Sequence, residues 1–391
     1  MFRSPWLRLI CFQVTCTVLL FSLPLRAQDR AKPSIVGNGS TKEWKFVVSG
    51  DSRNCGDAVM PMIAQGAAVE HATFYWHLGD LRAIYQPDED MGGFDPSWHT
   101  PVPKLSRDAY LESAWRDFRE KQVKPFKDKN IPFFIGIGNH ETIPPMARRK
   151  FRDAFQDLLD IDPLREQREL DKQQEIQTYY HWVRDGIDFI YLDNASDEEF
   201  DPEQMKWIMA QIERDRTDRS IRTIVVGMHK ALPGGYSDFH SMSETQLGLQ
   251  TGRCVYHKLL DLRSDSKKPV YILASHSHFF MHDMYDTPYW RNVGVLPGWI
   301  VGTAGAVRYR VPADTPAGSA KTDVYGYLVG TVNADGQPGK IRFDFHEIPK
   351  PDSAALDDAT LDKDLVNFCF NSNKQMSASV NQPPPPATDC Q

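Results

Sequence analysis

The sequence predicts an α/β protein with mixed β-sheets, and three observations support this prediction. Short apolar runs that end in Gly or a small polar residue alternate along the chain with longer segments of helical spacing. Near the C-terminal end, two further strand-like segments flank residues 333–339 (NADGQPG), a turn-rich sequence typical of an antiparallel hairpin. Antiparallel strands that follow a series of β–α units favour mixed sheets over one purely parallel sheet.

Six apolar runs are predicted as buried strands because each has the length of a strand and is bounded by small or polar residues. They cover residues 44–49, 73–78, 132–137, 187–192, 223–228 and 270–275. Helical spacing covers residues 58–69, 107–126 and 203–214. Asp201 before Pro202 predicts the N-cap of the third helix, and residues 325–332 and 340–348 are the strands of the hairpin.

The composition is that of a folded globular protein. Of the 391 residues, 41% are hydrophobic and 25% are charged, which excludes a disordered chain, a collagen and a polytopic membrane protein. The length allows two domains or one large domain with insertions.

The first 27 residues have the pattern of a secretory signal peptide. Arg3 and Arg8 precede an apolar run over residues 9–25, and Arg26 and Ala27 follow it. We expect cleavage after Ala27 and export to the periplasm or the extracellular space, with no stable membrane partner afterwards. The alternative is an uncleaved N-terminal anchor, because the run is near the lower length limit of a membrane span.

Removal of this segment makes the chain more acidic. It carries three Arg and no acidic residue, so 42 basic residues would face 52 acidic ones and the net charge would change from −7 to −10. A chain this acidic is not a general binder of polyanions, so no nucleic-acid partner is expected. The sequence gives no indication of the oligomeric state.

Four cysteines remain after cleavage: Cys55, Cys254, Cys369 and Cys390. In an exported chain they predict disulfides, with three possible connectivities. A bond between Cys369 and Cys390 is favoured because it would fix the C-terminal segment. No two cysteines have the spacing of a zinc-thiolate site. Residues 28–350 are predicted as the main folded domain and residues 351–391 as a Pro-rich tail, since the composition shifts to Asp, Ser and Ala and then to Pro.

Polar side chains of the kind that bind metals stand directly after five of the predicted strands. They are Asp51, Asp80, Asn139 with His140, His229, and His276 with His278. The carboxyl ends of strands in an α/β sheet meet at one rim, where ligands bind. Carboxylate and amide oxygens together with imidazole nitrogens suit Mn, Fe or Zn. Two carboxylates, one amide and the imidazoles of His229, His276 and His278 make six ligands. This exceeds the need of one ion, so two ions are expected, with Asp80 able to bridge them.

Taken in order, these motifs resemble those of the calcineurin-like metallophosphoesterases, a superfamily that includes the purple acid phosphatases. The matching segments are Gly50-Asp51, Gly79-Asp80, residues 138–141 (GNHE), His229 and residues 275–278 (SHSH), within the range 44–278. The resemblance implies two central mixed β-sheets packed face to face and flanked by helices, in four layers.

The resemblance also implies a role for each motif residue. Asp51, Asp80 and His278 would hold a first ion, and Asp80, Asn139, His229 and His276 a second. His140 would lie beside the substrate phosphate and stabilise charge or protonate the leaving oxygen. Its imidazolium form is expected to be accessible, because an unperturbed His titrates near ~6.5.

One position departs from the pattern. Most members of the superfamily carry a ligand His two residues after the first Asp, and Arg53 stands there instead. Arginine stays protonated and cannot bind a cation. The purple acid phosphatases use a Tyr three residues after the second Asp, where this chain has Ala83, with Tyr85 two residues later. Water could complete the first site, Tyr85 could reach it, or Arg53 could bind substrate phosphate; the third is favoured, with Arg82 as a second phosphate contact.

The basic run at residues 148–152 could steer an anion to the rim. We weight a solvated helix face more heavily, because Asp153, Asp157 and Asp160 follow. Trp182 and Trp290 are expected to pack in cores.

These features predict an exported, metal-dependent phosphoric-ester hydrolase that acts on a small phosphate ester. Water or hydroxide activated by two ions would attack phosphorus, with no covalent enzyme intermediate. One alternative is a phosphodiesterase or nucleotide pyrophosphohydrolase with the same site. The other is a non-catalytic binder of metal or phosphate on a degenerate scaffold, which Arg53 favours and the retention of His140 opposes.

Overall fold

The structure is a computed structural model of the chain, and it describes residues 42–81, 114–143, 146–195, 199–351 and 363–378. All of these belong to one compact unit, Asn38–Gln391. The predicted signal peptide lies outside the described residues, as do Arg82, Tyr85 and Cys390. Within the described ranges, every helix is too short or too polar to cross a bilayer.

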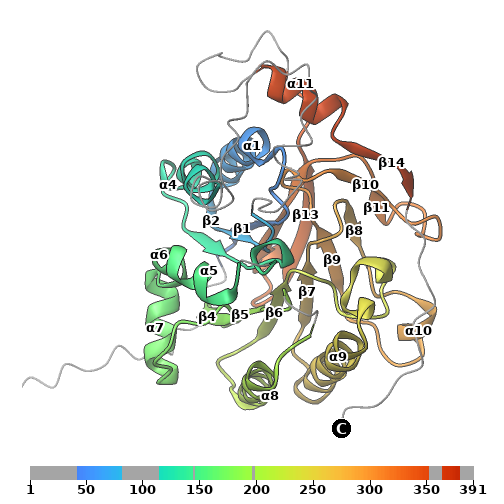
Figure 1. The fold of residues 1–391 in the computed structure, drawn as a ribbon. Helices are drawn as coiled ribbons and strands as arrows, with labels where there is room; N and C mark the ends of the chain where they lie inside the picture. The colour runs from blue at the N-terminus through green and yellow to red at the C-terminus, as the bar shows by residue number, and fades with distance from the viewer. Residues whose placement is uncertain (1–41, 82–113, 144–145, 196–198, 352–362, 379–391) are drawn as a thin grey trace, which may run out of the picture. The chain divides into compact units, whose positions relative to one another are not determined.

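Two mixed sheets form the centre of the unit (Figure 1). The first has the order β13 (Ile341–Glu347), β12 (Gly326–Val332), β1 (Trp44–Ser49), β2 (Ala72–His77) and β3 (Phe133–Ile135). The second has the order β11 (Ala320–Lys321), β8 (Phe280–His282), β9 (Gly298–Val301), β7 (Val270–Ala274), β6 (Thr223–Met228), β5 (Ile187–Leu192) and β4 (Tyr180–Arg184). In the first sheet β1, β2 and β3 are parallel, and β12 and β13 form the antiparallel pairs. In the second sheet β5, β6, β7 and β9 are parallel, and β4, β8 and β11 form the antiparallel pairs. The predicted mixed sheets are therefore confirmed.

The two sheets pack face to face through aromatic side chains. Phe46 of β1 meets Phe189 of β5 with ring centroids 5.1 Å apart, and Phe74 of β2 meets Trp182 of β4 at 5.4 Å. Trp182 also stacks on Phe134 of β3 at 4.0 Å. These four rings and Trp182 are fully or almost fully buried. Burial of such large side chains supplies much of the apolar area that holds the sheets together.

Helices flank both sheets (Figure 1). The helices on the side of the first sheet are α1 (Gly56–Val69), α4 (Lys124–Lys127) and α11 (Lys363–Asn371). The helices on the side of the second sheet are α8 (Pro202–Thr217), α9 (Gln246–Ser266) and α10 (Pro288–Arg291). Apolar residues of α8 and α9 share a core with β6 and β7. Asp201 caps α8 as predicted, because its carboxylate accepts a hydrogen bond from Gln204 N at 2.9 Å.

The basic run lies on α5 (Arg148–Ala154), which α6 (Gln156–Leu159) and α7 (Asp162–Asp171) follow. Arg148 donates to Asp193 at 2.6 and 3.0 Å, and exposed Arg149 lies 3.7 Å from Asp153. Arg152 donates to the Ile176 carbonyl oxygen. The basic side chains of this run therefore form ion pairs and a backbone hydrogen bond on a partly solvated helix.

The C-terminal segment is folded beyond the predicted domain boundary at residue 350. Helix α11 and strand β14 (Lys374–Ala378) pack on the unit, and β14 pairs with β10 (Arg308–Arg310). The predicted bond between Cys369 and Cys390 is wrong, because Cys369 is bonded to Cys55. Sequence separation does not decide the pairing here: the fold brings α11 next to the start of α1, and both sulfurs are buried.

Candidate metal centre

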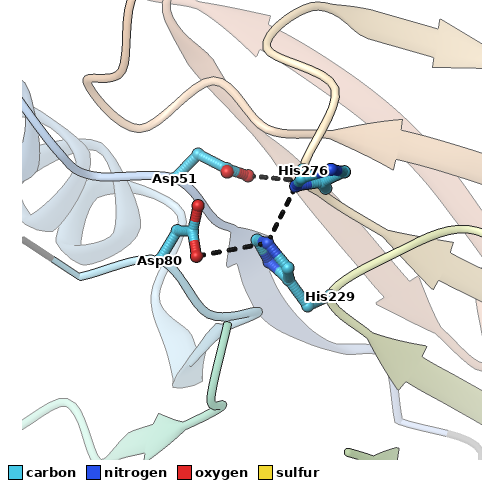
Figure 2. A group of neighbouring side chains, drawn as sticks. All are labelled: Asp51, Asp80, His229 and His276. Carbon is cyan, nitrogen blue, oxygen red and sulfur yellow. Dashed lines mark hydrogen bonds and ion pairs between the residues drawn. The ribbon is translucent and has the colours of Figure 1, made fainter. Parts of the chain in front are cut away.

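Seven of the predicted site residues converge at the carboxyl ends of the central strands. Asp51 follows β1, Asp80 follows β2, and His229 follows β6. The remaining four are Asn139 and His140 after β3, and His276 and His278 after β7. Figure 2 shows Asp51, Asp80, His229 and His276, which point toward one another from four different strands. One ligand atom from each of these four lies within 4.8 Å of the others.

The backbone turns sharply at three of these positions. Asp51, Asp80 and His276 have φ values of 61°, 57° and 65°, in the left-handed region that non-glycine residues seldom adopt. Hydrogen bonds fix two of the turns, since Asp51 N donates to Gly79 O at 3.0 Å and Asp80 N donates to the Glu141 carboxylate at 3.0 Å. Strain of this kind persists where the surroundings over-determine it, and it is concentrated at functional sites.

The third motif begins with glycine because Asp80 leaves no room for a side chain at position 138. A Cβ atom added to Gly138 would lie 2.1 Å from Asp80 Oδ1 and 2.3 Å from Asp80 N. Any side chain at this position would therefore displace the loop that carries Asp80.

The predicted second ligand set is closely gathered around one ring nitrogen. His229 Nε2 lies 2.9 Å from Asn139 Oδ1, 3.2 Å from Asp80 Oδ1 and 3.1 Å from His276 Nδ1. His229 Nδ1 lies 3.1 Å from the Leu78 carbonyl oxygen. A proton on Nδ1 would be donated to that oxygen and would leave the Nε2 lone pair facing the site, as in metal-binding histidines. Oxygen and nitrogen lone pairs brought this close to one another fit a cation between them.

The predicted first set is looser. His278 Nε2 lies 3.2 Å from Asp51 Oδ1, and His276 N donates to Asp51 Oδ2 at 2.7 Å. Asp51 Oδ1 and Asp80 Oδ2 are buried and receive no hydrogen bond of good geometry from a described residue. The nitrogen atoms that face them are His278 Nε2 at 3.2 Å and Arg53 Nε at 3.6 Å. Buried carboxylate oxygens in this state are costly, and a positive charge, from a bound ion or from Arg53, would offset the cost. The residues of the rim therefore fit a divalent transition-metal ion.

Arg53 lies within the centre rather than at its outer edge. It is only 3% exposed, and its Nη1 atom lies 2.6 Å from His140 Nε2. Its Nε atom lies 3.6 Å from Asp80 Oδ2. The guanidinium therefore faces both the buried carboxylate and the ring that would meet the substrate phosphate.

The surroundings of His140 disfavour its charged form. Burial, and then the Arg53 guanidinium, lower the pKa of His140 to about 3. They therefore favour the neutral ring over the expected imidazolium. Its backbone N–H donates to Asp80 Oδ1 at 3.1 Å, which links the third motif to the second.

The aspartates are held in the ionised state. Burial opposes the charge of Asp80, but His229, His140 and Arg53 outweigh it and hold the pKa of that carboxyl well below its usual range. Burial likewise opposes the charge of Asp51, and His278 outweighs it to lower the pKa. Both carboxylates are thus available to a cation at neutral pH.

Sequence reasoning missed Glu141, whose signal was its place in the GNHE motif. Its carboxylate accepts hydrogen bonds from Asp80 N, from Leu81 N at 2.9 Å and from Gly138 N at 2.8 Å. Burial, and then the charge of Asp80, raise the pKa of Glu141 to about 8. This side chain fixes the loop that presents Asp80.

A second group that the sequence did not indicate borders His276 and His278. His240 contacts the His276 ring edge-on at 5.0 Å and stacks on Tyr309 at 5.4 Å, and Tyr309 lies 4.1 Å from the His278 ring. Lys230 is 2% exposed and donates to Glu244 at 2.9 Å. Of these residues, only Lys230 could have been placed near the rim from the sequence, because it stands directly after His229. His240 and Tyr309 reach the rim through the tertiary fold.

No protein-family model matches the chain, and no curated protein does. Solved structures similar to it include a purple acid phosphatase from yellow lupin (Lupinus luteus) seeds, at 15% identity and a TM-score of 0.49 over 78% of this chain and 54% of that chain. Another is PhoD, at 13% identity and a TM-score of 0.49 over 79% and 70% of the two chains. A third is GAP50, the anchor in the inner membrane complex of Plasmodium, at 13% identity and a TM-score of 0.44 over 88% and 98%.

The chain spans about half the length of the lupin phosphatase. Similar structures described as phosphatases include the lupin enzyme and a dimetal phosphatase from Danio rerio. At such identities the likeness concerns the arrangement of the backbone. The chemistry is argued from the rim itself.

Proposed function

We propose that the chain is a metal-dependent hydrolase of phosphoric esters. The observation that carries this proposal is the gathering of Asp80, Asn139 and His276 within 3.2 Å of His229 Nε2, next to His140 and Arg53. An ion bound by these residues supplies positive charge that polarises a phosphoryl oxygen and activates water. Mn, Fe and Zn suit this donor set, and the motif resemblance implies two ions. The second set offers four protein ligands, whereas the first offers Asp51 and His278 besides the shared Asp80.

Arg53 and His140 are the chain's own groups for the phosphate. The planar guanidinium keeps its charge and can donate two hydrogen bonds to phosphoryl oxygens. The neutral His140 ring can donate one N–H to the same group. In the proposed reaction, the oxygen of water bonds to phosphorus, the bond from phosphorus to the ester oxygen breaks, and the proton that the water gives up is taken by that ester oxygen. A small phosphate ester is the proposed substrate.

The test compares hydrolysis of an aryl phosphate and a bis-aryl phosphate by the full chain, with Mn, Fe and Zn supplied in turn. His229→Ala should abolish both activities and lower the metal content. His71→Asn is the matched control, because His71 lies at the amino end of β2, away from the rim, and Asn tolerates its left-handed φ of 53°. Cleavage of the diester alone would favour the phosphodiesterase alternative. Bound metal with cleavage of neither substrate would favour the non-catalytic binder.

We further propose that the chain is exported. The buried disulfide between Cys55 and Cys369 supports this, because such bonds persist in oxidising compartments. Mass spectrometry of protein recovered from the periplasm or medium should find an N-terminus at Gln28. An intact N-terminus in the membrane fraction would instead indicate the uncleaved anchor.

A further inference from the structure

The two carboxylate oxygens of Asp80 face different groups. Oδ1 lies 3.2 Å from His229 Nε2, on the side of the second ligand set. Oδ2 lies 3.6 Å from Arg53 Nε and 3.7 Å from His140 Nε2. The oxygen through which Asp80 would bridge to a first ion is therefore directed at a guanidinium.

The Arg53 charge is permanent and poorly exposed to solvent. The side chains of Arg53 and Asp80 are 4% and 1% exposed. A guanidinium does not lose its proton in proteins, and charges that are shielded from water interact strongly. A divalent ion on the Arg53 side of Asp80 would meet this charge at short range, and among the residues that the structure describes it would have only Asp51 and His278 as further protein ligands.

Asp51 is also placed to join the other ligand set. Asp51, Asp80, His229 and His276 each offer one ligand atom within 4.8 Å of the others, which is close enough to serve one ion. His278 is held by contacts outside this ligand set. Its Nδ1 atom lies 2.8 Å from the Val307 carbonyl oxygen, and its ring packs against Tyr309. These contacts fix its ring without requiring a second ion.

We propose that the Arg53 guanidinium takes the place of the first ion, so that the centre binds one divalent ion through Asp80, Asn139, His229 and His276, with Asp51 beside them. This inference rests on the proposed function and deepens it. The substrate phosphate would lie between one metal ion and one guanidinium fork. Arg53 is thus a phosphate-binding residue that also sets the number of ions.

The experiment measures ions per chain by inductively coupled plasma mass spectrometry on the full chain loaded with Mn. We expect a ratio near one for the wild type and near two for Arg53→His, which replaces the guanidinium with a metal ligand. Arg53→Lys is the matched control, because it retains a positive charge, and its ratio should stay near one. Electron paramagnetic resonance of the Mn-loaded protein gives a second readout, with an isolated ion expected in the wild type and a spin-coupled pair in Arg53→His.

A wild-type ratio near two with a spin-coupled signal would overturn the inference and leave the proposed function intact. A ratio near one in both the wild type and a folded Arg53→His would also overturn it, because Arg53 would not be what excludes the second ion. If Arg53→His fails to fold, Arg53→Ala takes its place and should also bind more Mn than the wild type. A wild-type ratio near zero would instead contradict the proposed function itself.

Discussion

The carboxylate of Glu141 accepts a hydrogen bond from the backbone N–H of Asp80 at 3.0 Å, across 61 residues of sequence. The same carboxylate also accepts from the backbone N–H groups of Leu81 and Gly138. A buried side chain of one motif therefore holds the loop of another, and the position of Asp80, a proposed metal ligand, depends on Glu141.

Replacement of Glu141 by Gln tests this dependence. The Gln amide would turn an N–H group toward one of three backbone donors, and a buried donor without an acceptor costs about 1–3 kcal/mol. We expect the free energy of unfolding of Glu141→Gln to fall by that amount and the affinity for Mn to fall with it. Urea unfolding and metal titration measure the two effects.

Glu203→Gln is the control for this change, because Glu203 is exposed on the first turn of α8. It should leave both quantities nearly unchanged. Equal metal affinity in Glu141→Gln and the wild type would show that the Asp80 loop does not need this carboxylate.

His140→Ala separates phosphate binding from metal binding. The His140 side chain contacts Arg53 and lies 3.7 Å from Asp80 Oδ2, whereas the closely gathered ligand set is centred on His229. We expect turnover to fall by about 10²–10³-fold, the usual cost of losing one hydrogen-bond donor to charge that develops in the transition state, while the ions per chain stay the same. Steady-state kinetics and metal analysis on the same samples check this, and unchanged turnover would remove His140 from the mechanism.

The strands that carry the rim could be predicted because each is a short apolar run with small or polar residues next to it. Strands β1, β5 and β6 have the predicted bounds, since each is a short apolar run next to small or polar residues. The left-handed turns at Asp51 and Asp80 come within three residues of the ends of β1 and β2, so the sequence pattern and the site coincide.

Other features depend on contacts that no local pattern encodes. Helix α9 was missed because its apolar residues are interrupted by Gly248, Gly252 and several charged residues, and it is buried by tertiary packing. The orientation of Arg53 toward Asp80 depends on the loops after β2 and β3, which the spacing in the sequence does not fix. The disulfide partner of Cys369 depends on where α11 docks.

The disulfide supports the loop that carries Asp51. Cys55 N donates to Gly305 O at 3.0 Å, and Ala306 N donates to Asp51 O at 2.8 Å. Asn373, four residues after Cys369, donates to Gly305 O at 3.2 Å. The Cys55–Cys369 disulfide therefore anchors the C-terminal segment to the backbone around the rim.

Replacement of both Cys55 and Cys369 by Ser should destabilise the fold and loosen the centre. Removal of a native disulfide typically costs about 2–5 kcal/mol, and we expect a loss of unfolding free energy in this range together with weaker Mn binding. Denaturant unfolding compares the double variant with the oxidised wild type. A loss of stability without any change in metal affinity would show that the disulfide does not support the metal-binding rim.

A buried charge network between β4, β5 and α8 predicts a pH dependence of stability away from the metal centre. Arg214 pairs with Asp188 and lies 3.0 Å from Asp215, and His181 lies 2.9 Å from Asp188. Burial, and then the charge of Asp188, raise the pKa of Asp215 to about 8 from an ordinary value of 3.8. Burial opposes the charge of His181, but Asp188 and Asp171 outweigh it and raise its pKa to about 9.

Both shifts lower the stability of the protein as the pH rises. The folded state holds a proton on Asp215 that the unfolded state releases above 3.8, so this contribution is lost progressively until the pH passes about 8. The contribution of His181 is complete below 6.5 and is lost as the pH rises through about 9. Each proton changes the unfolding free energy by at most about 1.4 kcal/mol per pH unit.

Asp215→Asn removes one of these protons and keeps an oxygen that can accept from Arg214. We therefore expect the unfolding free energy of Asp215→Asn to fall less steeply between pH 5 and pH 8 than that of the wild type, in a range set by the two pKa values of Asp215. Asp261→Asn, on the exposed face of α9, is the matched control and should keep the wild-type slope. Urea unfolding at four pH values gives the slopes directly, and parallel curves for Asp215→Asn and the wild type would mean that Asp215 is ionised in the folded protein throughout this range.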